Sequence, residues 1–312
     1  MLRLALSLLL VFTFFSCDLF GIPPGGGGGE TGGGTGSNDF SKGFVFVRKA
    51  DGNVYVADDS DTSSASALTS AGASRHPSLS VDKQRVVFVT GTGDAAVIAT
   101  VPSTGGAVST VLTSSAQYRD FRTPVFSPSG ARIAFSYADG AISRIGVVDI
   151  DGTGLQTLAS TSPLSYATPS WSPDGTALYV AAGSALSELT QVERIEVASE
   201  TVANVTNTLG LSALGISGRL AVSPDGAKAA FDARVASGAT RIFTLDLSSK
   251  QVTQVYGGEA GGVESFPSWM DNGTLAFSSD TGGNDNLYSA TLPSTDSPAL
   301  LVPSAIEGWY SR

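Results

Sequence analysis

The chain has 312 residues, of which 42% are hydrophobic and 15% charged, and 18 Lys and Arg residues against 28 Asp and Glu residues give a formal net charge of −10. An acidic chain repels phosphate backbones, so the composition argues against a nucleic-acid partner. One cysteine and one histidine exclude an intramolecular disulfide, a cysteine-based zinc site and most histidine-rich metal sites. The composition therefore favours a protein without a cofactor.

The first residues have the pattern of an export signal. Arg3 is followed by an uncharged stretch over residues 4–15, which is too short for a membrane-spanning helix but typical of a signal-peptide core. The small residue Ser16 before Cys17 resembles the lipobox of bacterial lipoproteins. The resemblance implies that a signal peptide over residues 1–16 is removed and that Cys17 carries a lipid. The alternative is a plain secretory signal with an incidental cysteine.

A glycine-rich segment follows the cysteine. Residues 25–29 are five consecutive glycines, preceded by Pro23 and Pro24, and three more glycines occupy residues 32–34. Such a segment buries too little apolar surface to offset its ordering entropy. We expect residues 17–39 to be a flexible tether, and residues 40–312 to form one domain.

The rest of the chain is built from repeats. Five related segments begin at Pro77, Pro124, Pro169, Leu220 and Pro267, so the spacings between them are 47, 45, 51 and 47 residues. The fullest copies place a Ser-Pro-Asp-Gly turn between two apolar runs, followed by a third run and an outer one. A repeat of this length, made of short strands and turns, is typical of β-propeller blades.

The ends of the domain set the number of blades. Residues 43–48, 53–57 and 65–69 supply three strands without an inner strand, whereas residues 306–312 resemble an inner strand and then stop. The aligned repeats place Trp309 where Trp171 and Trp269 stand. The two ends together complete one blade, so the sequence predicts an all-β, six-bladed β-propeller of four-stranded antiparallel blades, closed by the C-terminal strand.

These repeats resemble the WD40-like units of the TolB propeller, which read Pro-x-Trp-Ser-Pro-Asp-Gly. Residues 149–152 (Asp-Ile-Asp-Gly) match a later part of that unit. The resemblance covers the chain after residue 39. TolB itself carries a further N-terminal domain, where this chain has a glycine tether, so the resemblance implies a TolB-like lipoprotein rather than TolB.

Residues just before each repeat should lie at the mouth of the central channel. The densest cluster of aromatic and charged residues in the chain, residues 118–122, falls in one of these loops, and such residues are common anchors of binding surfaces. The predicted partner-binding residues are Arg75, His76, Tyr118, Arg119, Asp120, Arg122, Glu259, Glu264 and Glu307.

Two other chemistries have weaker support. His76 is the only histidine and no Gly-x-Ser-x-Gly motif accompanies it, so we predict no Ser-His-Asp centre and no catalytic residue. Asp280, Asn284 and Asp285 offer oxygen ligands for calcium, but the pattern lacks the terminal Glu of a full calcium loop. A turn-rich connection is the favoured interpretation, and no metal site is predicted.

The leading hypothesis is a non-catalytic binding scaffold, monomeric, exported and lipid-anchored in the bacterial envelope. It would bind an envelope protein or a peptidoglycan-associated partner and touch the membrane only through its lipid. One alternative is a propeller enzyme, a polysaccharide lyase or glycosidase, with paired carboxylates roughly 5–9.5 Å apart at the channel mouth. Another is a purely structural subunit of an envelope complex.

Overall fold

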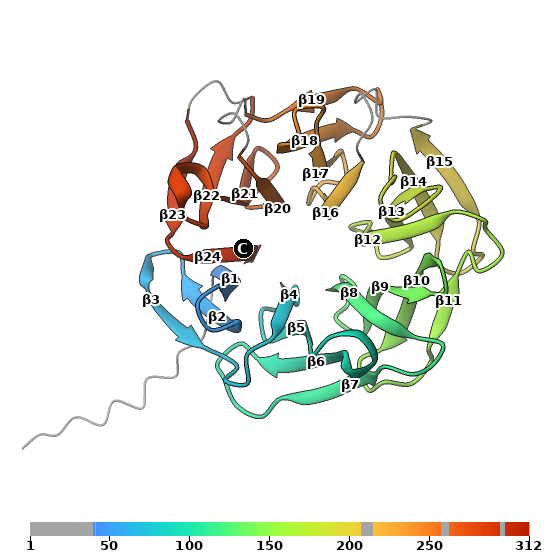
Figure 1. Ribbon diagram of the computed structural model, residues 1–312, viewed down its shortest axis with the longest axis horizontal. Helices are drawn as coiled ribbons and strands as arrows, with labels where there is room; N and C mark the ends of the chain where they lie inside the picture. Colours follow the sequence, from blue (N-terminus) through green and yellow to red (C-terminus); the bar gives the residue numbers. More distant parts are fainter. Residues whose placement is uncertain (1–39, 41, 207–214, 257–261, 294–296, 312) are drawn as a thin grey trace, which may run out of the picture. The chain divides into compact units, whose positions relative to one another are not determined.

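The computed structural model describes residue 40 and residues 42–206, 215–256, 262–293 and 297–311. One compact unit spans Asn38–Arg312, and its described part folds into six four-stranded antiparallel sheets arranged as the blades of a ring (Figure 1). The predicted six-bladed β-propeller is confirmed. The predicted signal peptide, Cys17, the tether and Glu259 lie outside the described residues. Within the described ranges, no helix combines the length and apolar character needed to cross a membrane.

Blades are numbered here from the one that joins the two ends of the domain. The inner strands of blades 1 to 6 are β24 (Ala305–Ser311), β4 (Ser74–Leu79), β8 (Arg119–Phe126), β12 (Ser165–Trp171), β16 (Ile216–Val222) and β20 (Glu264–Trp269). The second strands are β1 (Gly43–Arg48), β5 (Arg85–Thr90), β9 (Arg132–Asp139), β13 (Ala177–Gly183), β17 (Lys228–Arg234) and β21 (Thr274–Ser279). The third strands are β2 (Asn53–Asp58), β6 (Val97–Pro102), β10 (Ile142–Asp149), β14 (Gln191–Glu196), β18 (Thr240–Asp246) and β22 (Asn286–Thr291).

The outer strands are β3 (Asp61–Ala67), β7 (Ser109–Thr113), β11 (Gln156–Leu158), β15 (Val202–Thr206), β19 (Val252–Gln254) and β23 (Ala299–Val302). Two single-turn 3₁₀ helices, η1 (Gly93–Ala95) and η2 (Thr281–Gly283), lie between second and third strands. Second strands are buried on both faces because neighbouring blades cover them, whereas the outer strand β3 is mostly exposed.

The ring closes in blade 1. The C-terminal strand β24 pairs antiparallel with β1, which places Tyr310 opposite Phe44 and Trp309 opposite Val45. The sheet order β24-β1-β2-β3 therefore combines strands from the two ends of the domain, as predicted. Pairing with β24 covers the edge of β1, which would otherwise be exposed.

The Ser-Pro-Asp-Gly turns are held by their serine and aspartate. In blade 4 the Ser172 hydroxyl donates to Asp174 (2.6 Å) and accepts the N–H of Ala177 (3.0 Å), while Asp174 accepts the N–H of Thr176 (3.0 Å). Gly175 has a φ of +71°, a conformation that favours glycine. The side-chain chemistry of the repeat thus fixes the hairpin from the inner to the second strand.

Trp171 of blade 4 and Trp269 of blade 6 each form a hydrogen bond with the preceding blade. The indole N–H of Trp171 donates to the carbonyl of Val125 (3.3 Å), and that of Trp269 donates to the carbonyl of Ala221 (2.9 Å). The prediction that Trp309 is equivalent to Trp171 and Trp269 is wrong by one residue. Tyr310 takes that position in blade 1, where it pairs with Phe44, as Trp171 pairs with Leu178 in blade 4.

Because side chains alternate along a strand, the one-residue offset turns Trp309 to the opposite face of β24. Its ring faces the guanidinium of Arg219, 5.0 Å away, and it lines a cavity at one end of the central channel. The aligned repeats did not reveal the offset because glycine and glutamate replace the Pro-Ser sequence that precedes the other tryptophans.

Candidate binding site at the channel mouth

The inner strands share an unusual backbone feature at the channel. Each contains a bulge, and in five blades a non-glycine residue at the bulge has a positive φ between 44° and 55°. These residues are His76, Thr123, Thr168, Phe266 and Glu307, and Asp120 is a second such residue in blade 3. The left-handed conformation is unfavourable for residues with a side chain, and strain of this kind gathers at functional sites.

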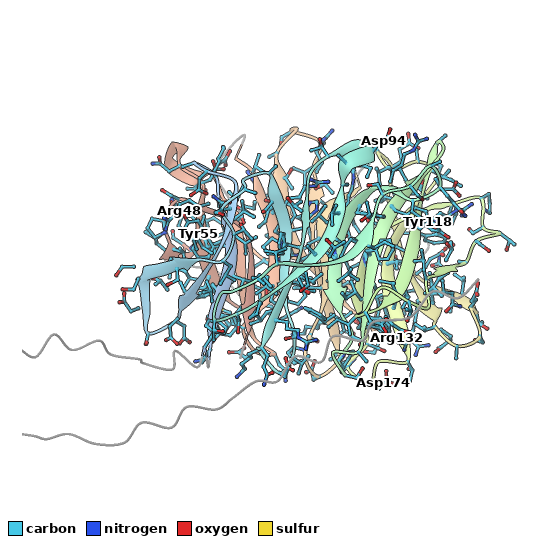
Figure 2. The ribbon with its side chains drawn as sticks, turned by 90° about the horizontal axis from the view of Figure 1, so that it is seen from below. Arg48, Tyr55, Asp94, Tyr118, Arg132 and Asp174 are labelled. Carbon is cyan, nitrogen blue, oxygen red and sulfur yellow. The ribbon has the colours of Figure 1, made fainter. Side chains whose placement is uncertain are left out.

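The two faces of the ring differ in their loops. Figure 2 shows Asp94 and Tyr118 on one face and Arg132 and Asp174 on the other. The loop containing Asp94 follows a second strand and the loop containing Tyr118 precedes an inner strand, and Asp94 pairs with Arg119 at 3.8 Å. We call this end of the channel the upper mouth, and the end at the Ser-Pro-Asp-Gly turns the lower mouth.

A cavity of about 320 Å³ opens at the upper mouth. Residues from blades 2 to 6 line it: Arg75, His76, Thr92, Asp120, Arg122, Thr123, Ser136, Ala167, Thr168, Leu186, Ser217, Gly218 and Phe266. The structure therefore brings four of the predicted residues, Arg75, His76, Asp120 and Arg122, into one cavity. We call it the mouth pocket.

The two arginines of the mouth pocket are held differently. Arg122 is bound to Asp120 two residues earlier, with Nε at 3.1 Å and Nη2 at 2.5 Å from the same carboxylate oxygen. Arg75 donates instead to the main-chain carbonyls of Gly91 and Phe121, which are neutral. Burial lowers the pKa of Arg75 from its ordinary value. These carbonyls orient its charge, which the carboxylates of Asp120 and Glu307 also attract.

His76 and Glu307 form the neighbouring wall of the channel. The main-chain N–H of His76 donates to the carboxylate of Glu307, and the N–H of Glu307 donates to the Ser278 hydroxyl (2.9 Å). Burial, with Arg219, Arg75 and Arg122 nearby, lowers the pKa of His76 to about 3. The imidazole is therefore neutral near pH 7. Burial also raises the pKa of the Glu307 carboxyl.

Arg219 spans the channel beneath the mouth pocket. It is only 3% exposed, and its guanidinium donates to the carbonyl of Gly308 (2.6 Å) in blade 1 and to that of Pro77 (3.3 Å) in blade 2. Its guanidinium lies between the rings of Phe266 and Trp309, at 5.4 and 5.0 Å. Burial lowers the pKa of Arg219 to about 10, so it stays charged near pH 7. The sequence placed Arg219 near the mouth without indicating this role.

Sequence reasoning missed Asp232 altogether. This fully buried carboxylate accepts hydrogen bonds from the Ser217 hydroxyl (2.7 Å) and from the N–H groups of Gly218 (2.6 Å) and Arg219 (2.7 Å). It thereby holds the bulge that projects Arg219 across the channel. The only signal was an aspartate within the apolar run of residues 229–233. Burial raises the pKa of Asp232, and these hydrogen bonds oppose the shift.

Four other predicted residues do not line the mouth pocket. Tyr118 packs on the ring of Tyr137, with centroids 4.8 Å apart, and Arg119 pairs with Asp94 on the outer rim. Glu264 is buried between blades 5 and 6, where it accepts the N–H of Ile242 (3.4 Å). The partly buried Glu307 accepts the N–H of His76 in the channel wall.

The oxygens proposed for calcium are engaged separately. Asp280 accepts the N–H of Val263 (2.7 Å), whereas Asp285 forms an ion pair with Lys49 from blade 1. In the ranges that the structure describes, no three His, Cys, Asp or Glu side chains gather as a metal site requires.

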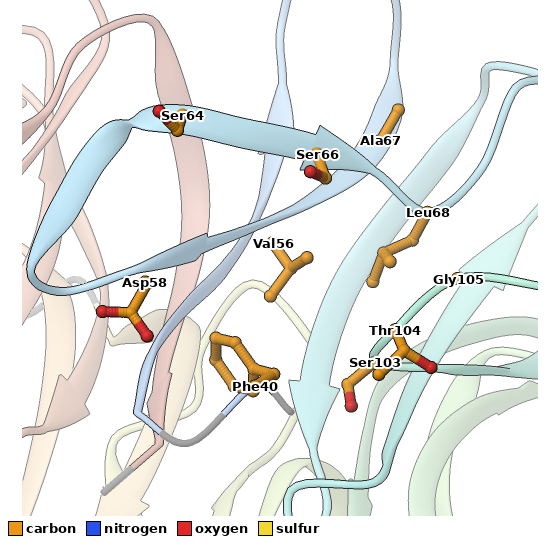
Figure 3. A pocket seen from close by; sticks show the side chains of 10 residues that line it. All are labelled: Phe40, Val56, Asp58, Ser64, Ser66, Ala67, Leu68, Ser103, Thr104 and Gly105. Carbon is orange, nitrogen blue, oxygen red and sulfur yellow. The ribbon is translucent and has the colours of Figure 1, made fainter. Parts of the chain in front are cut away.

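Two further cavities lie away from the mouth pocket. The lower mouth holds a cavity of about 230 Å³ lined by Val81, Phe126, Pro224, Trp309 and other residues. Another, of about 300 Å³, opens between blades 1 and 2 (Figure 3), where Phe40 lies beside Val56 and Leu68. The second cavity combines apolar side chains with serine hydroxyls that have local partners, such as Ser64, which donates to Asp61.

Comparison with known proteins supports the fold. No protein-family model matches the sequence, and no curated protein matches it. Among solved structures, TolB from Acinetobacter baumannii superposes with a TM-score of 0.68 at 17% identity, covering 88% of this chain and 67% of that one. A putative TolB from Agrobacterium tumefaciens gives 0.59 at 14% identity, covering 84% of this chain and 89% of that one.

Propellers with other roles are also similar. A chain of a nidogen/laminin complex gives a TM-score of 0.69 at 12% identity, with 87% of this chain and 99% of that one covered. The oligogalacturonate lyase of Vibrio parahaemolyticus gives 0.55 at 14% identity, with 81% and 75% covered. At these identities the likeness concerns the fold. In fold, the chain is a six-bladed β-propeller, and it is similar in fold to the TolB propellers.

Proposed function

We propose that this protein is a non-catalytic binding scaffold of the bacterial envelope, anchored by a lipid on Cys17, whose upper mouth binds a protein partner. The observation that carries the proposal is the mouth pocket, where side chains from five blades converge above Arg219. A rigid ring that presents loops around one concave site suits recognition. The likeness to TolB propellers and to a propeller from a nidogen/laminin complex supports such a role.

The proposal places contact at one end of the ring, which crosslinking tests directly. A photo-crosslinking amino acid at Leu186, which lines the mouth pocket and is 37% exposed, should capture a partner in intact cells. The matched control is the same amino acid at Val81, 65% exposed at the lower mouth. Equal capture at both positions, or capture at Val81 alone, would contradict the proposal.

The second candidate is a propeller enzyme acting on acidic polysaccharide. The similarity to oligogalacturonate lyases favours it. Its test is incubation of the protein with oligogalacturonate, with and without manganese, followed by the ultraviolet absorbance of an unsaturated product. Turnover that is lost in an Arg75→Gln variant would favour the lyase over the binding scaffold.

A further inference from the structure

Two buried polar atoms in the mouth pocket have no partner in the described part of the chain: Thr168 Oγ1 and His76 Nδ1. Thr168 is only 4% exposed. Burying a hydroxyl without a hydrogen bond is unfavourable, and most native hydroxyls avoid it. Both residues also have the left-handed backbone described above, and both line the cavity. The site therefore offers hydrogen-bonding groups that the chain itself does not use.

The charges that line the mouth pocket sum to a positive value. Arg75 and Arg122 face a single lining carboxylate, Asp120, which already binds Arg122. Deeper in the channel, Arg219 and Glu307 lie near each other, and Asp232 is enclosed by donors. The lining residues thus carry one net positive charge, from two arginines and one aspartate, although Asp120 and Glu307 also act on Arg75 and the whole chain carries −10. The positive charge of the lining favours an anionic ligand group.

We propose that the mouth pocket binds a carboxylate of a protein partner, an acidic side chain, with Arg75 as its counter-ion and the Thr168 hydroxyl as a donor. The inference rests on the proposed function and names the group that is recognised. A guanidinium and a hydroxyl are common donors to carboxylates, and a cavity of about 320 Å³ accommodates one side chain. The apolar residues Leu186 and Phe266 at the same pocket suit the aliphatic part of that side chain.

The test uses the full-length chain and three small probes observed by saturation-transfer NMR: N-acetyl-glutamate, N-acetyl-glutamine and galacturonate. We expect N-acetyl-glutamate to bind, and the neutral amide of the same shape to bind at least tenfold more weakly. Equal binding of acid and amide, or no binding of the acid at millimolar concentration, would overturn the proposal. Preference for galacturonate would overturn it in favour of an acidic sugar.

Variants test the named residues in opposite directions. Arg75→Gln should abolish binding of N-acetyl-glutamate, and Thr168→Val should weaken it about tenfold. Asp120→Asn removes the lining carboxylate and should strengthen binding severalfold, whereas Arg119→Gln, on the same strand but outside the pocket, should leave it unchanged. Unchanged affinity in Arg75→Gln would overturn the assignment.

A stability measurement checks the Thr168 hydroxyl independently. Valine has nearly the same shape and removes only the unpartnered hydroxyl, so Thr168→Val should raise the melting temperature of the ligand-free protein by about 2 °C. A lowered melting temperature would show that the hydroxyl already has a partner and would overturn its role as a donor to the ligand. If crosslinking at Leu186 succeeds while the probe experiments fail, the binding face stands without the carboxylate pocket.

Discussion

The guanidinium of Arg219 lies 5.0 Å from the centre of the Trp309 ring, inside the central channel. This contact joins blade 5 to the blade that closes the ring, and the hydrogen bond from Arg219 to Gly308 reinforces it. A buried arginine is tolerable here because main-chain carbonyls satisfy its donors and aromatic rings flank its plane. Closure of the ring thus depends on side-chain contacts across the channel as well as on strand pairing.

We expect Arg219→Lys to destabilise the protein by roughly 2 kcal/mol, since an ammonium on a flexible stem does not reproduce the hydrogen bonds to Gly308 and Pro77. Denaturant unfolding measures the change. The matched control is Arg132→Lys, whose guanidinium lies 5.2 Å from Trp171 on the lower face. An equal, small effect of both substitutions would contradict the bridging role.

Inner-strand serines offer a second test of how blades are joined. The Ser170 hydroxyl accepts the N–H of Val222 in the next blade (2.9 Å), and Ser268 accepts that of Tyr310 (2.9 Å). Removing either hydroxyl leaves a main-chain N–H without its acceptor, so Ser170→Ala and Ser268→Ala should each cost about 1–2 kcal/mol of unfolding free energy.

The chain contains its own control for these serines. Ser78 stands at the equivalent position of blade 2, but its buried hydroxyl has no partner in the described part of the chain. Ser78→Ala should therefore leave the unfolding free energy unchanged or raise it slightly. Urea titrations of all three variants measure this. If Ser170→Ala, Ser268→Ala and Ser78→Ala all lost the same unfolding free energy, the inter-blade hydrogen bond would not be the cause of the loss.

The parts of the fold that the sequence predicted are those that turn chemistry or the repeat pattern marks. The hairpin at Ser172–Gly175 follows from turn chemistry, and the closing strand follows from the missing inner strand at one end and the isolated one at the other. The sequence also predicted that Arg75, His76 and Arg122 lie at the channel, because each stands just before a repeat.

The parts that were not predicted depend on partners from distant blades. Whether Trp309 packs between blades or faces the channel depends on where the bulge falls, which pairing with β1 decides. Glu264 faces Ile242 rather than the mouth pocket because neighbouring blades pack against β20. Asp232 looked like one polar residue in a strand until Gly218 and Arg219 supplied its donors.

Ring closure predicts a large effect of a small truncation. Deleting residues 305–312 removes β24, exposes the edge of β1 and removes the acceptor that Gly308 offers to Arg219. We expect aggregation or loss of cooperative unfolding, measured by light scattering and circular dichroism. As the control, Tyr310→Phe removes only the hydroxyl that contacts Asp59 (3.0 Å) and should still unfold cooperatively. A truncated chain that melts like the wild type would contradict closure.

The proposed lipid anchor is tested separately from the ring. Cys17→Ser should leave the protein unprocessed or move it from the membrane to the soluble fraction, because stable anchoring requires the acyl chains. Ser16→Ala keeps a small residue before the cysteine and should preserve membrane association. Metabolic labelling with a fatty acid, followed by fractionation, measures both. An unmodified Cys17 in mature, membrane-associated protein would rule out the anchor.

Glu264 predicts how stability changes with pH. Burial raises its pKa from 4.5 to about 7 in the folded protein, while Arg241 and the N–H of Ile242 oppose the shift. Between these two pH values the folded state holds a proton that the unfolded chain releases, so stability falls as the pH rises through this window. Glu264→Gln removes this titration and should make the variant roughly 2–3 kcal/mol more stable relative to wild type at pH 8 than at pH 4.

The difference between wild type and variant at each pH isolates Glu264 from the other titrating groups. His76, whose pKa is lowered to about 3, gives the opposite slope: its contribution is present above pH 6.5 and is lost as the pH falls toward 3. Because both proteins contain His76, its effect cancels in the difference. Urea unfolding at pH values from 4 to 8 supplies the free energies. A difference that does not change with pH would mean that the Glu264 carboxyl titrates normally, and would contradict the raised pKa.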